Sequence, residues 1–312
     1  MQHRDKMNTE INNFLKAEGF ETSDIYDHGS FDIVARKNLL MLLVKTFNNI
    51  DGVNKTNSSE MKQLANIFLA SPIIIGEKSR KGKLEDGVIY ERYDIPTITL
   101  NTFKHMISYE EYPEIIADRG GYFVKINGNV LKEYRDRNSL SLKELAEKAH
   151  VSRATMYKYE NDMVKVNTET AILLEEIIGD KITEDINILK PGKNGEELKY
   201  SDAENTKILY KLGYGVISTN KSPFDAAAKI KNKESKPLIA NIEKNRTPET
   251  LKKMAVPLKD LSLITSSESV FIVDNEKISE LIGEIPVVKS WELEEFEKSK
   301  DLLKLIKERK NN

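Results

Sequence analysis

The chain of 312 residues contains no cysteine. Disulfides, zinc ribbons and thiol nucleophiles are therefore all excluded. No glycine-rich phosphate loop follows an expected strand, and no Ser, His and Asp stand in the order of a catalytic triad. Histidine is scarce, and its four copies lack the spacing of metal ligands: His3, His28, His105 and His150. We therefore expect neither a metal nor another cofactor.

Long apolar runs are also missing. The longest, residues 39–44, is far too short to cross a bilayer, so we expect no membrane contact. The polar residues 1–12 lack the apolar core of a secretory signal. Together with the absence of cysteine, these features predict a soluble protein in the cytoplasm.

Neither sign of charge is in excess. Lys and Arg number 48 against 50 Asp and Glu, which gives a net charge of -2. This balance excludes a histone-like coat on a polyanion and requires any nucleic-acid contact to be local. A composition of 39% apolar and 31% charged residues is typical of globular proteins, and the length predicts two or three domains.

Two parts of the chain resemble each other. Phe31-Asp32 recurs as Phe224-Asp225, and residues 61–65 resemble residues 251–255 in the same order along the chain. This pattern indicates an internal repeat. Short apolar and Lys-containing matches also arise by coincidence in a chain of this composition, and that alternative stays open.

Each copy of the repeat predicts alternating helices and strands. Helices are expected at residues 9–17, 57–68, 203–212 and 248–258. Later strands are expected at residues 73–76 and 95–100, matched by 261–265 and 285–288. Residues 291–310 have the pattern of an amphipathic helix that packs on the second copy.

The segment between the copies, residues 128–179, is helical in character. One helix carries apolar residues at the spacing i, i+3, i+4 and i+7: Leu142, Leu145, Ala146 and Ala149. Ser141 and Glu144 predict a capping box at its start. Ser152 predicts the cap of a second helix that ends near residue 160, with Met156 and Tyr159 facing inward. Further helices are marked by Leu131 and Tyr134, and by Ile172, Leu173, Ile177 and Ile178.

The predicted fold class is therefore α/β plus all-α. We expect an α/β domain at residues 1–118, a helical domain at residues 128–190 and a second α/β domain, a repeat of the first, at residues 195–312.

Residues 131–160 closely resemble the helix-turn-helix of the phage-repressor and Xre family. The blocks Leu140-Ser141-x-x-Glu144-Leu145-Ala146 and Val151-Ser152-Arg153-x-Thr155-x-x-x-Tyr159-Glu160 keep the spacing of that family. The resemblance implies that residues 152–160 are the recognition helix, and that Glu160 pairs with Arg135 at the edge of the core. His150 departs from the family, which usually has a glycine in this left-handed turn.

A helix of this length, about 13 Å, fits the major groove of B-DNA, which is about 12 Å wide. With Met156 and Tyr159 inward, we expect six residues to lie at the DNA: Ser152, Arg153, Ala154, Thr155, Tyr157 and Lys158. Ser152 and the first helix amides can hold a phosphate. A solvated helix face is the alternative. Because one such module binds weakly, we predict a homodimer that reads two half-sites about 34 Å apart on double-stranded DNA.

The first α/β copy resembles the restriction-endonuclease-like nucleases. That resemblance rests on Glu10 in the first helix, Asp32 on a strand and Lys45 on the next strand. Those enzymes have a second carboxylate two positions before the Lys, where this chain has Leu43. Because Leu offers Mg²⁺ no oxygen, we expect no catalytic site unless an acid such as Glu60 takes its place.

The second copy keeps Asp225 but has neither the second acid nor a clearly aligned Lys in the strand at residues 237–242. Two degenerate copies favour a scaffold. Asp32 and Lys45 are then expected to form a buried ion pair or a remnant that faces phosphate.

The arrangement of all three segments resembles a family of archaeal helix-turn-helix transcriptional regulators. The resemblance implies a sequence-specific regulator rather than an enzyme. A Mg²⁺-dependent nuclease or junction resolvase guided by the helix-turn-helix is the main alternative, motivated by Asp32 and Lys45. An antitoxin or adaptor that uses the helix-turn-helix for autoregulation is a third. The sequence identifies neither an operator nor an effector.

Overall fold

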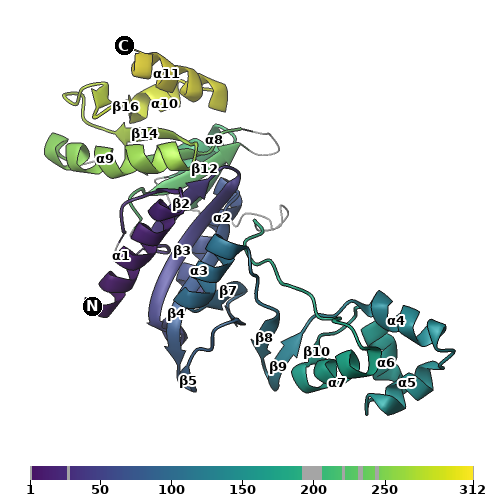
Figure 1. Cartoon of the computed structure of the whole chain (residues 1–312). Coiled ribbons are helices and arrows are strands. Elements are labelled where there is room, and N and C mark those ends of the chain that lie inside the picture. Colours follow the sequence, from purple (N-terminus) through teal and green to yellow (C-terminus); the bar gives the residue numbers. More distant parts are fainter. Residues whose placement is uncertain are drawn as a thin grey trace. The chain divides into compact units, whose positions relative to one another are not determined.

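The computed structural model describes residues 2–26, 29–191, 206–219, 222–230, 235–242 and 246–311. The chain forms two compact units (Figure 1). The first unit combines Met1–Asn48, Gly52–Ile74 and Leu189–Asn312, and the second combines Asn49–Asp51 and Ile75–Ile188. Within the described ranges, no helix is both long enough and apolar enough to cross a membrane. His28 and the first three residues of the predicted helix at 203–212 lie outside the described residues.

The chain begins with the following elements: α1 (Gln2–Ala17), β1 (Glu21–Thr22), β2 (Ile33–Lys37), β3 (Leu40–Asn49), η1 (Ile50–Gly52), α2 (Lys55–Phe68) and β4 (Ser71–Ser79). β1, β2 and β3 pair in antiparallel order, with Val34 opposite Leu43. Six consecutive residues of β3 are buried, which is typical of a strand covered on both faces. The expected helices at residues 9–17 and 57–68 are confirmed, and the first starts earlier than predicted.

The C-terminal part of the first unit has these elements: α8 (Lys207–Lys211), β11 (Tyr214–Ser218), β12 (Ala226–Ile230), β13 (Leu238–Ile242), α9 (Pro248–Ile264), β14 (Glu268–Val273), β15 (Leu281–Ile282), β16 (Ile285–Lys289), α10 (Ser290–Glu294) and α11 (Ser299–Asn311). The strands form one sheet in the order β11-β12-β13-β14-β16-β15. β11, β12 and β13 are antiparallel, whereas β14 runs parallel to β13 and β16. The order of an antiparallel strand trio, a helix and a further strand is thus the same as from β1 to β4.

The two α/β segments of the first unit pack against each other reciprocally. α2 of the first segment contacts β11 and β12 of the second, and α9 of the second contacts β2 of the first. The rings of Phe68 and Phe224 meet edge to face with centroids 6.3 Å apart. Arg36 of β2 donates to the carbonyl of Ile264 at the end of α9. Each segment therefore covers part of the other's sheet with the helix that follows its third strand.

The second unit contains the end of β4 and these elements: β5 (Gly82–Lys83), β6 (Val88–Arg92), β7 (Ile95–Ile98), α3 (Leu100–Tyr109), β8 (Ile115–Asp118) and β9 (Gly121–Val124). β5 forms a hairpin with β4, and β6 forms another with β7. β8 runs parallel to β6 and turns back into β9.

A helical bundle follows in the same unit (Figure 1). Its elements are α4 (Gly128–Arg137), α5 (Leu142–Lys148), α6 (Arg153–Glu160), β10 (Val166–Asn167) and α7 (Thr168–Ile178). The short strand β10 pairs with β9, so the bundle continues from the β8–β9 hairpin. Its core is made of fully or nearly fully buried side chains: Leu131, Leu145, Ala146, Met156, Val166, Ala171 and Leu174. The predicted helices, and the capping box of Ser141 and Glu144, are confirmed.

α4 and α6 cross very closely at Gly128. A Cβ atom at this position would lie 2.4 Å from the carbonyl oxygen of Tyr159 and 2.7 Å from that of Glu160. The backbone amide of Gly128 also donates to Asp162, which follows α6, at 2.8 Å. The absence of a side chain at Gly128 therefore sets how near α4 comes to the C-terminal end of α6.

Three expectations about elements are wrong. Residues 261–265 do not form a strand, because α9 continues through Pro257 and buries Leu258, Leu261 and Ile264 on one helical face. The strand of this region is β14, at Glu268–Val273. Residues 291–310 form two helices, α10 and α11, rather than one. In α7, Ile172 is exposed, and Ala171 and Leu174 supply the core contacts instead.

Replacement of Gly128 by Ala should lower the free energy of unfolding by about 1–3 kcal/mol, because the new methyl group forces α4 and α6 apart. Chemical denaturation followed by circular dichroism measures the change. The matched control is Gly52→Ala, where the backbone is unstrained and the nearest atom would be at an ordinary 3.7 Å. Equal stabilities of the two variants would contradict the close approach.

Candidate nucleic-acid interface

The inner side of α6 is fixed by packing and capping. Met156 and Tyr159 are buried in the bundle core, as predicted. Ser152 is the N-cap: its hydroxyl accepts a hydrogen bond from the amide of Thr155 at 3.0 Å. The Thr155 hydroxyl lies 2.8 Å from the same Ser152 oxygen. The start of the helix is therefore held by a local hydrogen-bond pair.

The outer side of α6 carries most of the residues expected at DNA. Arg153, Ala154, Tyr157 and Lys158 are exposed, and so is Ser152 next to them. Thr155 is only half-buried rather than fully outward, and its hydroxyl is already engaged with Ser152. Neither Arg153 nor Lys158 forms an ion pair within the described part of the chain. Both cations are consequently available to an external anion.

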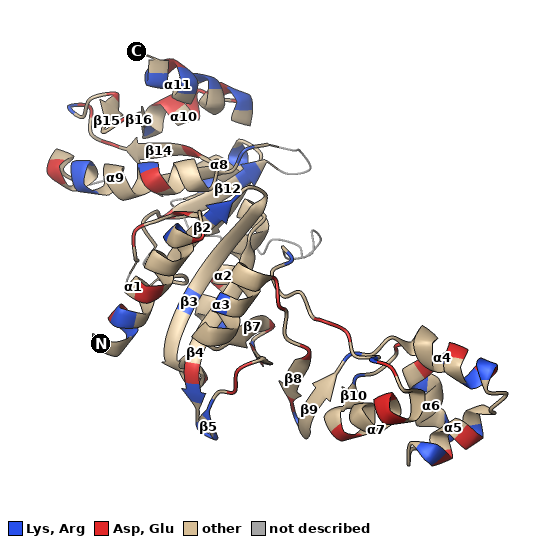
Figure 2. Cartoon of the chain, in the orientation of Figure 1, with Lys and Arg blue, Asp and Glu red and all other residues tan. Residues whose placement is uncertain are grey.

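Basic and acidic residues are interspersed on the neighbouring helices α4 and α5 (Figure 2). On α4, Arg137 pairs with Glu133 at 2.8 Å, and on α5, Lys143 lies 3.6 Å from Glu147. These exposed pairs neutralise charge locally and add little stability. Basic and acidic side chains are therefore close to balanced on α4 and α5.

The turn between α5 and α6 is left-handed at His150, with φ at 55°. The amide of His150 donates to the carbonyl of Glu147, and that of Val151 donates to the carbonyl of Ala146. The helix thus ends through backbone hydrogen bonds of the kind that usually involve glycine at this position. His150 thus adopts the left-handed conformation that the resemblance predicts for a glycine here.

Arg135 of α4 forms an ion pair at the C-terminal end of α6. Its guanidinium donates to both carboxylate oxygens of Glu160, at 2.7 and 3.2 Å. The Glu160 side chain is only 4% exposed, so its charge requires this partner. The hydrogen bonds with Glu160 raise the pKa of Arg135 above its ordinary value. The predicted ion pair of Arg135 with Glu160 is therefore confirmed.

Asp32 forms the centre of the nuclease-like segment, and it is fully buried. One oxygen accepts from Lys45 at 2.6 Å and from Arg4 at 2.5 Å. The other accepts from the amide of Thr46 at 2.8 Å and from its hydroxyl at 2.9 Å. Both oxygens are thus occupied by protein donors, and the predicted buried pair of Asp32 and Lys45 is confirmed.

The other expected members of a nuclease site are not brought to Asp32. Glu10 is exposed on α1, and the residues of α1 that reach the Asp32 cluster are Arg4 and Asn8. Leu43 is fully buried in the core, two positions before Lys45. Among the described residues, no three His, Asp or Glu side chains are grouped so that they could hold a metal ion.

Asp225 occupies the corresponding place in the second segment. The amide of Asp32 donates to Val44, and the amide of Asp225 donates to Ala240 on the corresponding strand. The carboxylate of Asp225 accepts from the amide of Ile242 at 2.8 Å and from Arg246 at 3.1 Å through both oxygens.

This register aligns Lys45 with Asn241. The side-chain nitrogen Nδ2 of Asn241 lies 3.4 Å from the backbone carbonyl oxygen of Pro223. Sequence reasoning missed the cations Arg4 and Arg246, which neutralise the two acids from different elements. No local spacing links either arginine to its acid, although Arg4 and Asn8 do share one face of α1 at a spacing of four residues.

Comparisons with known proteins match two separate segments of the chain. Residues 4–113 match the PD-(D/E)XK superfamily domain, and residues 131–183 match a helix-turn-helix domain. These matches confirm the resemblances to restriction-endonuclease-like domains and to the Xre-type helix-turn-helix. No solved structure matches the chain.

Archaeal relatives span the whole chain. A protein of Methanobrevibacter smithii named "Putative HTH-type transcriptional regulatory protein" is 65% identical over 100% of both chains. A protein of the same name from Methanothermobacter thermautotrophicus is 50% identical over 98% of this chain and 97% of its own. A similarly named protein from Pyrococcus furiosus is 32% identical over 98% of each chain.

Removal of the Asp32 carboxylate tests its role as a buried ion-pair centre. Asp32→Ala should lower the free energy of unfolding by about 3–5 kcal/mol, because the buried Lys45 ammonium loses its counter-charge. Asp225→Ala should cost less, since the Asp225 side chain is 37% exposed and water can replace it. Chemical denaturation of both variants measures the difference. A larger loss in Asp225→Ala would contradict this assignment.

Proposed function

The chain belongs to this archaeal family of proteins named as HTH-type transcriptional regulators, and on that premise we propose that it is a sequence-specific regulator that binds double-stranded DNA as a dimer through α6. The single observation that carries the proposal is the outer face of α6. There, Arg153 and Lys158, which form no ion pair with any residue that the structure describes, project from a helix whose inner side is buried.

The dimensions of α6 suit the major groove. Its eight residues span about 12 Å at 1.5 Å per residue, comparable with the groove width of about 12 Å. Arg153 lies in the first turn, where a recognition helix meets base edges. In this proposal Ser152 and the first amides of α6 hold a phosphate, and Lys158 adds charge about one turn further on. Ala154, Thr155 and Tyr157 complete the contact surface.

A dimer is proposed on grounds of affinity. Residues 128–165 carry eight Lys and Arg against six Asp and Glu, so the module has little excess positive charge. A few phosphate contacts from one module give weak, salt-sensitive binding. Two modules that read half-sites about 34 Å apart would combine their contacts on one duplex.

We further propose that residues 1–118, 128–190 and 195–312 are the three domains, and that the outer two are repeats. The shared order of elements and the equivalent positions of Asp32 and Asp225 support the repeat. In this proposal the α/β domains are a scaffold for dimerisation rather than an enzyme. The neutralisation of Asp32 by Lys45 and Arg4 supports that role.

Arg153→Ala should weaken binding to the preferred operator by about 1–3 kcal/mol if the side chain reads a base, and equally on all sequences if it holds a phosphate. The operator is first obtained by selection of bound genomic fragments, and fluorescence anisotropy then gives the affinities. Arg137→Ala is the matched control, because that guanidinium is already paired with Glu133. Unchanged affinity of Arg153→Ala on every sequence would refute the recognition role of α6.

The match to the PD-(D/E)XK superfamily favours a second candidate, a Mg²⁺-dependent nuclease. We expect plasmid and branched DNA to remain intact with Mg²⁺ or Mn²⁺, since Leu43 offers no metal ligand and protein cations already occupy Asp32. Gel electrophoresis of the incubated DNA measures cutting. Metal-dependent cleavage that is lost in Asp32→Asn would establish the nuclease instead.

A further inference from the structure

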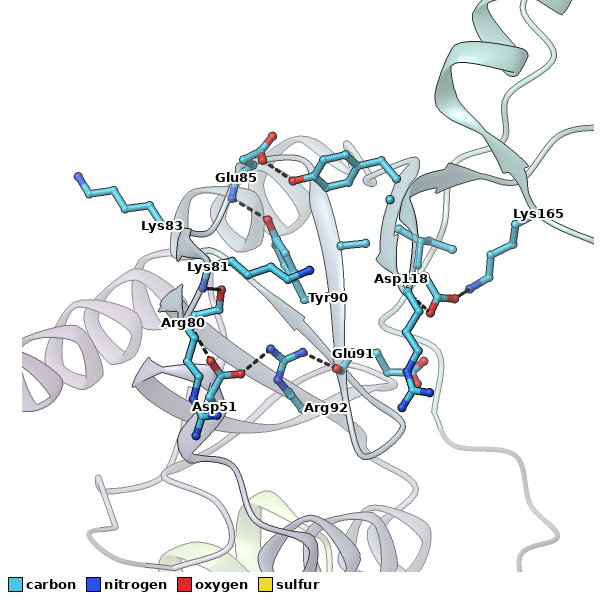
Figure 3. Close-up of a pocket in the computed structure, with 16 residues that line it drawn as sticks. Asp51, Arg80, Lys81, Lys83, Glu85, Tyr90, Glu91, Arg92, Asp118 and Lys165 are labelled. Carbon is cyan, nitrogen blue, oxygen red and sulfur yellow. Dashed lines mark hydrogen bonds and ion pairs between the residues drawn. The ribbon is translucent and has the colours of Figure 1, made fainter.

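A cleft of about 830 Å³ lies in the second unit, apart from α6 (Figure 3). Its walls come from the β4–β5 hairpin, from β6, from the β8–β9 hairpin and from the segment just before β10. This volume is within the range of about 300–1,000 Å³ that is usual for small-molecule sites. The cleft is therefore large enough for a ligand of nucleotide size.

The cleft is basic. It is lined by four acidic side chains and by six cationic ones, which are Arg80, Lys81, Lys83, Arg92, Arg119 and Lys165. Only two of the six form ion pairs within 4 Å among the described residues. Arg92 pairs with Asp51 at 2.9 Å, and Lys165 pairs with Asp118 at 3.1 Å. The other four are exposed, and Lys81 extends toward the middle of the cleft in Figure 3.

The two acids of the cleft that form ion pairs, Asp51 and Asp118, also accept backbone hydrogen bonds. Asp51 accepts the backbone amide of Arg80 at 2.6 Å, and this hydrogen bond together with Arg92 holds its pKa below the ordinary value. Asp118 accepts the amide of Arg119 at 2.7 Å, which likewise lowers its pKa, with Lys165 contributing. These carboxylates neutralise Arg92 and Lys165. The other four cations of the lining face two further carboxylates, Glu85 and Glu91, so the lining keeps an excess of two positive charges.

One wall of the cleft carries two tyrosines fixed by a single acid. The Tyr90 hydroxyl accepts the backbone amide of Glu85 at 3.1 Å, and the Tyr122 hydroxyl donates to the Glu85 carboxylate. Both hydroxyls are thereby held in place, and Figure 3 shows Tyr90 beside Glu85. Aside from these rings, the only larger apolar contribution to the lining is Ile116. The wall offers aromatic surface and little aliphatic surface.

We propose that this cleft binds a small phosphate-bearing anion of about nucleotide size. Lys81, Arg119 and the other two exposed cations of the lining would form charge-assisted hydrogen bonds with the phosphate oxygens. The tyrosine rings would contact an organic part of the ligand. A mostly aliphatic ligand does not fit a lining so rich in charge.

A small anion fits the cleft better than the backbone of a duplex. Lys81 extends toward the middle of a concavity bounded by two hairpins, whereas a rod of DNA requires charges spread along an open surface. One lining residue also belongs to the helical bundle: Lys165 lies between α6 and α7 and is held to β8 through Asp118. An anion that attracts Lys165 would compete with Asp118 for its ammonium group. Binding in the cleft would thereby act on a residue of the bundle that contains α6.

Isothermal titration of the full-length protein with ATP, and separately with tripolyphosphate, tests the site without any DNA. We expect saturable binding to one site per chain. The double variant Lys81→Glu/Arg119→Glu should weaken it at least about tenfold. The control Lys125→Glu/Lys132→Glu makes the same change of net charge at exposed lysines outside the cleft and should bind as the unchanged protein does.

Equal affinity for the two probes would assign recognition to phosphate alone, and tighter binding of ATP would assign a part to the tyrosine wall; both support the site. The proposal is overturned if neither probe binds, or if both double variants weaken binding equally. The anisotropy assay with DNA is run on the same cleft variant as a separate measurement. The proposal is also overturned if that variant binds both probes as the unchanged protein does but loses affinity for DNA, because the cleft would then hold the duplex backbone. Since the titration contains no DNA, its failure leaves the proposed role of α6 unaffected.

Discussion

The placement of α6 depends on how its inner side is bound to the rest of the helical bundle. Arg135 neutralises the buried carboxylate of Glu160, and Gly128 allows α4 to approach the last turn of α6 within backbone contact. With Met156 buried in the same core, the helix cannot rotate about its axis without exposing an unpaired charge or an apolar side chain. The outward direction of Arg153 and Lys158 follows from this constraint.

Two aspartates of the first unit, the buried Asp32 and the half-buried Asp225, are stabilised by different sets of donors. A carboxylate removed from water needs donors and a counter-charge. Asp32 obtains them from Lys45, Arg4 and Thr46, whereas Asp225 obtains them from Arg246 and the amide of Ile242. In both cases the protein supplies the positive charge that a metal ion would supply in a nuclease. The carboxylates then serve to join the elements around them.

The two α/β segments of the first unit each cover part of the other with a helix. α2 contacts the sheet of the second segment, and α9 contacts β2 of the first. Phe68 and Phe224 bury aromatic surface at this junction, and such edge-to-face pairs stabilise an interface beyond their area. Neither segment alone buries all of the apolar surface that the other covers, so we expect the two to depend on each other for stability.

The sequence alone predicted the features that are encoded by neighbours along the chain. Helix periodicity and caps near Ser141 and Ser152 located α5 and α6, and the inward spacing of Met156 and Tyr159 identified the outer face of α6. The pair of Arg135 with Glu160 and the lack of a second acid at Leu43 were instead inferred from family resemblances. The signals of periodicity and capping are local because hydrogen bonds and side-chain periodicity within one helix or strand act over a few residues.

Only the tertiary structure decided which distant side chains meet. Arg4 reaches Asp32 from α1, and the cations and tyrosines of the cleft converge from three separate parts of the chain. The extension of α9 beyond Pro257, where a strand was expected, is fixed by burial of Leu261 and Ile264 in the core. Such outcomes depend on contacts between elements far apart in sequence, whose packing energy outweighs local preference.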